Sequence, residues 1–242
     1  TIPKPKYFTK DGQEKESDWT WDETTKTLSV ALTENPDAYP IALDPTLAFT
    51  APGSTSGGDA IVGEATGNYF GYALTSGDFN ADGKTDLAVG AYNYSNTYGR
   101  AYIFYNDGGI SAGAMNADVI IEGVDANAYF GSSLSSGDFN ADGKTDLIAS
   151  AYRYSANSGR VYIFYQDGSY PATIAGADVV VTGEASSHYF GVPLTTGDFN
   201  ADGEADLVVV AKSYSSSTGR TYVFYGGSIV TENASGADII IT

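Results

Sequence analysis

Oxygen-bearing side chains recur at fixed spacing in one stretch that the chain carries three times. Residues 78–86 read Asp-Phe-Asn-Ala-Asp-Gly-Lys-Thr-Asp, residues 138–146 repeat them unchanged, and residues 198–206 differ only by Glu and Ala at positions 7 and 8. Each copy follows the previous one by 60 residues. Oxygen donors at positions 1, 3, 5 and 9, with Gly at position 6, are the layout of a calcium-binding loop.

A hard cation such as calcium takes roughly six to eight oxygen ligands, which alternate positions of a tightly curled backbone can supply. The Gly permits the sharp turn, and the carbonyl at position 7 turns inward as a further ligand. The sequence therefore predicts three Ca²⁺ ions as cofactors. The expected ligands are Asp78, Asn80, Asp82, Lys84 and Asp86; Asp138, Asn140, Asp142, Lys144 and Asp146; and Asp198, Asn200, Asp202, Glu204 and Asp206.

An ordinary turn is the competing interpretation, because Asn-Ala-Asp-Gly is also a turn sequence. A turn needs the glycine, but it does not need the fourth oxygen, and all three copies keep Asp at position 9. The loop also differs from an EF-hand, because position 12 is apolar rather than Glu and no helical pattern flanks it.

The composition describes an acidic chain, long enough for one large all-β domain or two small domains. Of its 242 residues 42% are hydrophobic, and 30 acidic against 12 basic residues give a net charge of −18. Three doubly charged calcium ions would bring that charge to −12, and a strongly acidic chain repels phosphate, so we expect no nucleic-acid partner. The chain has no cysteine, which excludes disulfides and thiolate metal sites.

Acidity and calcium loops without a bidentate Glu indicate a secreted, extracellular or cell-surface protein, because extracellular calcium is concentrated enough to fill weak sites. No apolar run is long enough to form a membrane span. The chain begins at Thr1 rather than Met and shows no signal peptide, so we expect a processed fragment that has lost its targeting segment.

Three segments are expected along the chain. Residues 1–18 form a polar leader, and residues 19–57 form a β-rich segment that is either a degenerate blade or the end of a preceding domain. Within it, Trp19–Trp21 and Thr27–Leu32 are predicted strands, residues 39–50 are Pro-interrupted and suited to a sheet edge, and residues 51–58 are a linker. Residues 58–242 are the periodic part.

Each periodic unit predicts four short strands separated by Gly and Asn turns. A short strand leads into the calcium loop, and the second strand begins at Leu87, Leu147 or Leu207. The third and fourth strands of the first unit are residues 100–105 and 118–121, with counterparts 60 and 120 residues later. Four strands per unit describe a β-propeller blade, so the fold class is all-β.

The units resemble FG-GAP repeats, the blades of integrin alpha-type propellers and of many bacterial secreted proteins. The Phe-Gly signal stands at residues 70–71, 130–131 and 190–191, and the calcium loop completes it. The Gly-Ala-Pro element is degenerate, reading Gly-Ala-Tyr, Ser-Ala-Tyr and Val-Ala-Lys from residues 90, 150 and 210. Residues 39–46 are also similar to a stretch that precedes such repeats in bacterial surface proteins. The resemblance implies a calcium-binding propeller.

Integrin-type propellers have seven blades, and the chain has three clear units. Closed propellers need at least about four blades. Residues 19–64 could supply a degenerate blade, with residues 60–62 where a fourth strand belongs. Alternatively, the missing blades could come from a second subunit or from sequence that has been deleted. The N-terminal segment, the leader above all, could also mediate self-association.

A second set of loops, at residues 92–98, 152–158 and 212–218, emerges on the face opposite the calcium loops. They share that face with the connections between units and are rich in Tyr, Ser and Asn, a composition suited to recognising a protein or glycan ligand. The alternative is that their tyrosines pack between blades. The residues concerned are Tyr92, Tyr94, Tyr152, Tyr154 and Tyr214.

Catalysis has little support in the sequence. His188 is the only histidine and replaces Asn or Ala of the other units, which indicates a surface substitution rather than a general base. Arg100, Arg160 and Arg220 recur at the start of the third strand, where pairing with an acidic group is expected. We therefore expect a non-enzymatic, extracellular calcium-binding module for binding or adhesion. The alternatives are a structural subunit of an extracellular assembly or filament, and a non-catalytic propeller of a secreted hydrolase.

Overall fold

The computed structural model describes residues 6–8, 14–16, 18–22, 27–31, 60–107 and 113–242. Contacts divide the chain into a first unit, residues 1–59, and a second unit, residues 60–242. No helix in these described ranges is both long and apolar enough to cross a membrane.

The first unit contains two short antiparallel pairs of strands. Strand β1 (Lys6–Phe8) pairs with β2 (Glu14–Glu16), and β3 (Asp18–Asp22) pairs with β4 (Thr27–Ala31). The strand predicted at residues 19–21 is therefore confirmed, as is the strand predicted at residues 27–32 over its described residues 27–31. The polar leader contains a strand pair that its composition did not suggest. The expected edge segment at residues 39–50 and the linker at residues 51–58 lie outside the described residues.

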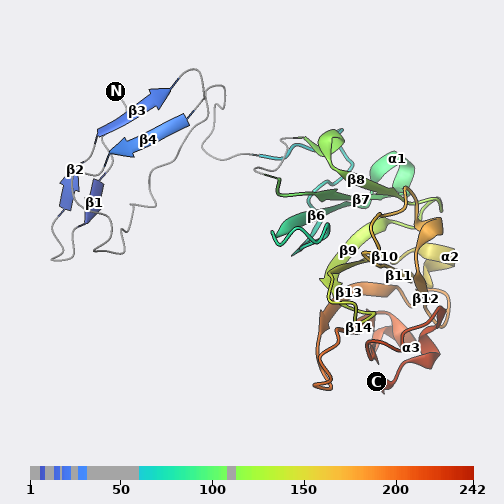
Figure 1. The fold of residues 1–242 in the computed structure, drawn as a ribbon. Helices are drawn as coiled ribbons and strands as arrows, with labels where there is room; N and C mark the ends of the chain where they lie inside the picture. The colour runs from blue at the N-terminus through green and yellow to red at the C-terminus, as the bar shows by residue number, and fades with distance from the viewer. Residues whose placement is uncertain (1–5, 9–13, 17, 23–26, 32–59, 108–112) are drawn as a thin grey trace. The chain divides into compact units, whose positions relative to one another are not determined.

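The second unit is three successive sheets, each built on four antiparallel strands of one sequence unit (Figure 1). Repeat 1 comprises β5 (Ala73–Gly77), β6 (Asp86–Ala91), β7 (Arg100–Phe104) and β8 (Val119–Glu122). Repeat 2 comprises β9 (Phe130–Gly137), β10 (Asp146–Ala151), β11 (Arg160–Phe164) and β12 (Val179–Thr182). Repeat 3 comprises β13 (Phe190–Gly197), β14 (Asp206–Ala211), β15 (Arg220–Phe224) and β17 (Ile239–Ile241). The predicted all-β, four-stranded repeats are confirmed.

Short turns complete each repeat. A four-residue helical turn joins the second strand to the third, at α1 (Tyr94–Thr97), α2 (Tyr154–Asn157) and α3 (Tyr214–Ser217). Figure 1 shows these three turns along the same side of the array. A 3₁₀ turn precedes the fourth strand, at η2 (Ala114–Asn116), η3 (Ile174–Gly176) and η4 (Ala234–Gly236).

The central strands are buried on both faces, which is why their sequences are apolar runs rather than alternating patterns. Every residue of β10 is buried, and all but the first of β11. The core fills the space between consecutive sheets. One apolar cluster joins repeats 1 and 2 through Phe79 and Leu134, and another joins repeats 2 and 3 through Phe139 and Leu194.

Backbone pairing also links neighbouring repeats. In a parallel arrangement, β12 pairs with β16 (Glu232–Asn233) of repeat 3, and Glu122 forms the equivalent bridge to Thr173. Val62 forms the same bridge to Gly113, so residues 60–62 occupy the place of a fourth strand preceding repeat 1, as predicted. Within residues 60–107 and 113–242, no strand pairing joins the sheets of repeats 1 and 3, so the structure shows no ring closure there.

Candidate functional site

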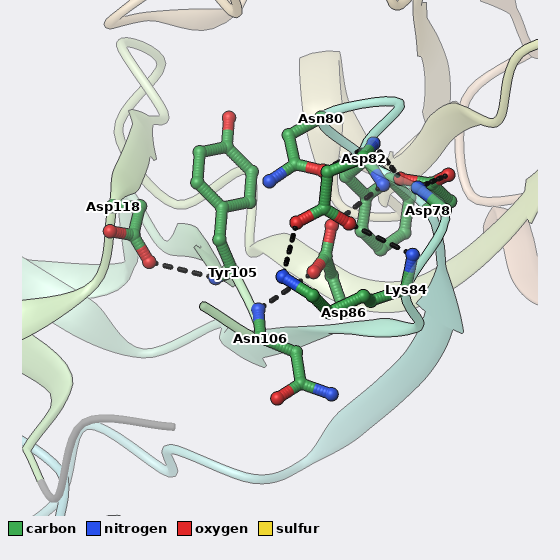
Figure 2. Close-up of polar contacts among 10 residues, drawn as sticks. Asp78, Asn80, Asp82, Lys84, Asp86, Tyr105, Asn106 and Asp118 are labelled. Carbon is green, nitrogen blue, oxygen red and sulfur yellow. Dashed lines mark hydrogen bonds and ion pairs between the residues drawn. The ribbon is translucent and has the colours of Figure 1, made fainter. Parts of the chain in front are cut away.

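The predicted calcium loops connect the first and second strands of each repeat. In the first loop, Asp78 accepts hydrogen bonds from the backbone N–H groups of Asp82, at 3.0 Å, and Gly83, at 2.8 Å. Asn80 Oδ1 accepts another from the Asp82 N–H, and Asp82 Oδ1 accepts one from the Lys84 N–H. Figure 2 shows Asn80, Asp82 and Asp86 close together on the inner side of the loop.

The same hydrogen bonds recur in the other two loops, with distances between 2.8 and 3.1 Å. The curl depends on two positions with positive φ. Gly83 has φ +84°, as position 6 requires, and Ala81 at position 4 has φ +59°. The left-handed alanine was not predicted, since such a conformation is uncommon for a residue with a Cβ atom.

The Asp at position 9 is buried and joins the loop to the third strand. Both oxygens of Asp146 accept backbone hydrogen bonds at 2.9 Å, one from Phe139 and one from Gln166. Asp86 is bonded in the same way by Phe79 and Asn106 (Figure 2). Asp206 is bonded in the same way by Phe199 and Gly226. Burial raises the pKa of Asp146 to about 6, although the two N–H donors oppose that shift. The Asp at position 9 therefore has a structural role in addition to its predicted role as a calcium ligand.

The chemistry of the loop fits calcium. All its donors are oxygens, and a carboxylate oxygen that accepts one N–H keeps a second lone pair for a cation. The Lys84 ammonium lies 3.0 Å from Asp82 and lowers the pKa of that carboxyl by hydrogen bonding. This pair is exposed, so it is a weak competitor for an incoming ion. Repeat 3 carries Glu204 in place of that lysine.

Among the described residues, no group of three or more His, Cys, Asp or Glu side chains is already gathered closely enough to hold a metal ion. A bound calcium ion would supply positive charge that neutralises the loop carboxylates. Asp78, Asn80 and Asp82, the Lys84 carbonyl and Asp86 would hold it in repeat 1, and the remaining predicted ligands would do so in repeats 2 and 3.

A further recurring aspartate was not singled out from the sequence. Asp118, Asp178 and Asp238 accept the backbone N–H of the residue that follows the third strand, at 2.7 to 2.8 Å. Each therefore fixes the end of that strand, as Figure 2 shows for Asp118 and Tyr105. The sequence could have indicated these aspartates, because they recur at a constant spacing of 60 residues.

Two of the three recurring arginines pair with an acidic group, as predicted, and the prediction is wrong for Arg160. Arg100 forms ion pairs with Glu64 at 2.8 Å and Glu122 at 2.7 Å, and Arg220 pairs with Glu184 at 3.3 Å. Arg160 instead donates to the Thr182 hydroxyl. Each guanidinium also lies 3.6 Å from the ring centre of a tyrosine that begins the helical turn, namely Tyr94, Tyr154 or Tyr214.

The tyrosines that the sequence analysis singled out for recognition fall into two groups with different contacts. Tyr154 and Tyr214 pack against the clusters between repeats, as the packing alternative predicts. Tyr92 and Tyr152 instead belong to a row of aromatic rings that crosses all three repeats. We call this row the tyrosine ladder; its members are Tyr69, Tyr72, Tyr92, Tyr129, Tyr152 and Tyr189.

Neighbouring rings of the ladder are in contact. Centroid separations are 5.1 Å from Tyr69 to Tyr92, 5.3 Å from Tyr92 to Tyr129, 5.6 Å from Tyr129 to Tyr152 and 6.0 Å from Tyr152 to Tyr189. Apart from Tyr72, ladder residues alternate between the start of a repeat, before its first strand, and the residue that follows its second strand. That alternation places the row on the face opposite the calcium loops.

Two basic side chains lie against the ladder. Arg153 is 4.8 Å from the Tyr129 ring centre, and Lys212 is 5.3 Å from the ring centres of both Tyr152 and Tyr189. Lys212 is the residue of repeat 3 that corresponds to Tyr92 in repeat 1 and Tyr152 in repeat 2. A lysine ammonium therefore replaces an aromatic ring in repeat 3. Burial raises the pKa of Tyr92 and of Tyr152, so both hydroxyls stay neutral at physiological pH.

His188 differs from the predicted surface substitution. It is partly buried, and its ring packs edge-on against Tyr214 with centroids 4.9 Å apart. Its Nδ1 has no hydrogen-bond partner among the described residues.

Comparison with known proteins identifies the repeats. The family model described as "FG-GAP repeat" matches residues 70–104, 130–164 and 190–224. Phosphatidylinositol-glycan-specific phospholipase D of Bos taurus is 33% identical over 175 residues, which cover 65% of this chain and 21% of that protein. Integrin alpha-PS2 of Drosophila melanogaster is 35% identical over 170 residues, covering 66% of this chain and 12% of the integrin.

Integrin alpha-2 of Bos taurus is 38% identical over 165 residues, covering 62% of this chain and 13% of that protein. The chain thus spans about a fifth or less of the length of these relatives. Each matched segment contains a Phe-Gly signal, a calcium loop and the first three strands of one repeat. The chain belongs to the FG-GAP repeat family and is homologous to the propeller regions of integrin alpha subunits and of phosphatidylinositol-glycan-specific phospholipase D.

Proposed function

We propose that the chain is an extracellular, non-catalytic binding module in which calcium loops order one face and the opposite face binds a protein or glycan ligand. Calcium supports this because the three loops share one internal hydrogen-bond pattern and an all-oxygen donor set. The extracellular setting is supported by the integrin and phospholipase relatives and by the millimolar calcium that weak loops need.

The tyrosine ladder is the observation that carries the ligand proposal. Tyr69 is 57% exposed and Tyr72 is 59% exposed, although both are large aromatic residues in contact with other rings. Tyrosine offers a rigid amphipathic surface whose ordering costs little conformational entropy, which is why it is frequent at recognition surfaces. Arg153 and Lys212 add exposed hydrogen-bond donors beside those rings.

Protein and glycan arrays probed with the chain in millimolar calcium would test this. We expect a ligand whose binding falls at least about tenfold in Tyr129→Ala and Tyr152→Ala, which corresponds to about 1.4 kcal/mol. Tyr129→Phe keeps the ring and should bind normally. Met115→Ala is a matched control, because Met115 is 75% exposed and lies outside the ladder. Binding that is indifferent to both alanine variants, or no binding at all, would contradict the proposal.

A second candidate is a non-catalytic propeller of a secreted hydrolase. The specific observation in its favour is that several of the relatives are phosphatidylinositol-glycan-specific phospholipases D, matched over only 18% to 21% of their length. The coding sequence around this chain distinguishes the two candidates, because an adjoining hydrolase domain would favour the second.

A further inference from the structure

A glutamate stands just ahead of repeats 1 and 3, but not of repeat 2. Glu64 and Glu184 occupy this position, and the corresponding residue ahead of repeat 2 is Val124. Glu64 accepts hydrogen bonds from the Arg100 guanidinium at 2.8 Å and from the Tyr102 hydroxyl at 2.9 Å. The equivalent arginine of repeat 3 donates to both oxygens of Glu184 at 3.3 Å. In these two repeats, a carboxylate of the chain itself therefore pairs with the arginine that begins the third strand.

Repeat 2 keeps the arginine and the tyrosine without the carboxylate. Arg160 donates its Nε–H to the Thr182 hydroxyl, and its Nη1 and Nη2 have no acceptor among the described residues. Thr182 stands where repeat 1 has a second glutamate. The buried Tyr162 hydroxyl likewise has no hydrogen-bond partner in the described ranges. Val124 is 49% exposed and has no acceptor in its side chain, and no ion pair joins the adjacent Asp125 to Arg160 within the part of the chain described.

The arginine, rather than the tyrosine alone, distinguishes repeat 2. The Tyr222 hydroxyl of repeat 3 also has no partner among the described residues, although Glu184 pairs with the arginine beside it. One face of the Arg160 guanidinium lies on the Tyr154 ring, 3.6 Å from its centre, so the edge of the guanidinium is available to a further acceptor. Burial raises the pKa of Tyr162 to about 12, so its hydroxyl keeps a proton to donate at physiological pH.

This unpaired arginine lies on the face of the tyrosine ladder. Arg160 follows the helical turn α2, and Val124 lies in the connection between repeats 1 and 2, so both belong to the face opposite the calcium loops. Tyr129 of the ladder is five residues beyond Val124. A ligand that covers the ladder therefore passes close to the place of the missing glutamate.

We propose that Arg160 and Tyr162 form a carboxylate-binding subsite, in which a glutamate or aspartate side chain of a protein ligand takes the place of the missing glutamate. This rests on the proposed function, because the same ligand would contact the ladder. Arginine binds carboxylates through paired N–H donors, and a glutamate side chain is the occupant in the other two repeats, which favours a protein over an acidic glycan. Salt screens the repulsion from acidic residues more than about 8 Å away. The Tyr162 hydroxyl is covered in the free chain, so the groups that cover it must shift when the carboxylate binds.

The test is a titration of the full chain, in millimolar calcium and at constant ionic strength, with N-acetylglutamate α-amide, whose only charge is the side-chain carboxylate. Nuclear magnetic resonance shifts of the Arg160 side chain and of the Thr182 backbone amide report binding. We expect saturable shifts with this probe and none with N-acetylglutamine amide, which has the same shape without the charge. Arg160→Gln should weaken binding at least about tenfold and Tyr162→Phe at least about threefold. Shifts that are equal for the two probes would overturn the proposal.

Val124→Glu restores the carboxylate within the chain and provides a test at a half-exposed position, where folding is not at risk. It should abolish binding of the probe and raise the melting temperature by about 2–4 °C. Val124→Gln is the matched control and should do neither. Asp125→Asn should leave the melting temperature unchanged. Probe binding that survives Val124→Glu would overturn the subsite, as would a loss of stability in Asp125→Asn equal to that in Arg160→Gln, because Asp125 would then already occupy it.

Two further outcomes separate the subsite from the proposed function. A protein ligand found on the arrays should lose at least about tenfold in affinity in Val124→Glu and keep its affinity in Val124→Gln. A ligand that depends on Tyr129 but is indifferent to Val124→Glu would overturn the subsite and leave the proposed function standing. Glucuronate that binds more tightly than the glutamate probe, with the same dependence on Arg160, would overturn the choice of a protein ligand in favour of an acidic glycan.

Discussion

The aspartate at position 9 of the calcium loop, Asp146 in repeat 2, has two roles. Its carboxylate is a predicted calcium ligand, and it also satisfies two backbone N–H groups that would otherwise be buried without partners. Among the described residues, the exposed Asp142 of the same loop accepts one hydrogen bond, from the Lys144 N–H, and forms an ion pair with the Lys144 ammonium at 3.6 Å. The two residues should therefore respond differently to the same substitution.

We predict that Asp146→Ala lowers the free energy of unfolding by about 2–4 kcal/mol even in chelator, because two N–H donors lose their acceptor. Asp142→Ala should remove calcium binding from that loop and leave the stability of the calcium-free protein close to wild type. Urea denaturation in chelator measures the change in the free energy of unfolding. Calorimetric titration with calcium measures the loss of calcium binding. Equal stability of the two variants in chelator would show that position 9 has no separate structural role.

At the scale of the element, the first strand ends in a glycine because the next repeat approaches it closely. A Cβ atom on Gly137 would lie 2.6 Å from the Cβ of Ala205, and one on Gly77 would collide with Thr145. The nearest atoms to such a Cβ on Gly197 belong to the ring of Phe199, at 3.4 Å. The glycine is thus required by close packing of the next repeat at Gly77 and Gly137, but not at Gly197.

Gly137→Ala should cost about 1–3 kcal/mol through overpacking, whereas Gly197→Ala should be nearly neutral. Thermal and urea denaturation of both variants, with calcium present, would measure the difference. The two positions share the end of a first strand and the start of a calcium loop, so a common effect of losing glycine would appear in both variants. Similar losses in both would contradict the role given to the neighbouring repeat.

The elements themselves were largely predictable from local patterns. Apolar runs bounded by Gly and Asn gave the strands to within one or two residues, and the loop motif located the sharp turn. Contacts between repeats were not predictable in this way. The tyrosine ladder joins residues 23 and 37 positions apart in turn, such as Tyr69 to Tyr92 and Tyr92 to Tyr129. Such contacts depend on how successive sheets stack, which sequence periodicity does not specify.

For the whole molecule, the repeated loops predict a stability that depends on calcium. A site that is filled at one hundred times its dissociation constant contributes about 2.7 kcal/mol. We therefore expect chelation to lower the melting temperature by at least about 5 °C, because about 1 kcal/mol corresponds to roughly 2–4 °C in a chain of this size. Differential scanning calorimetry with and without chelator measures this, with magnesium at equal ionic strength as the control. An unchanged melt and no calcium by elemental analysis would contradict the three predicted sites.

Repeat 2 alone has a neighbouring repeat on both sides among the described residues. When units contact only their nearest neighbours, opening begins where a unit has a single neighbour and then propagates inward. Amide hydrogen exchange in dilute protein should therefore be fast in β17, whose residues are 41%, 40% and 57% exposed, and slowest in the fully buried β10. Uniform protection of the three repeats would contradict this order.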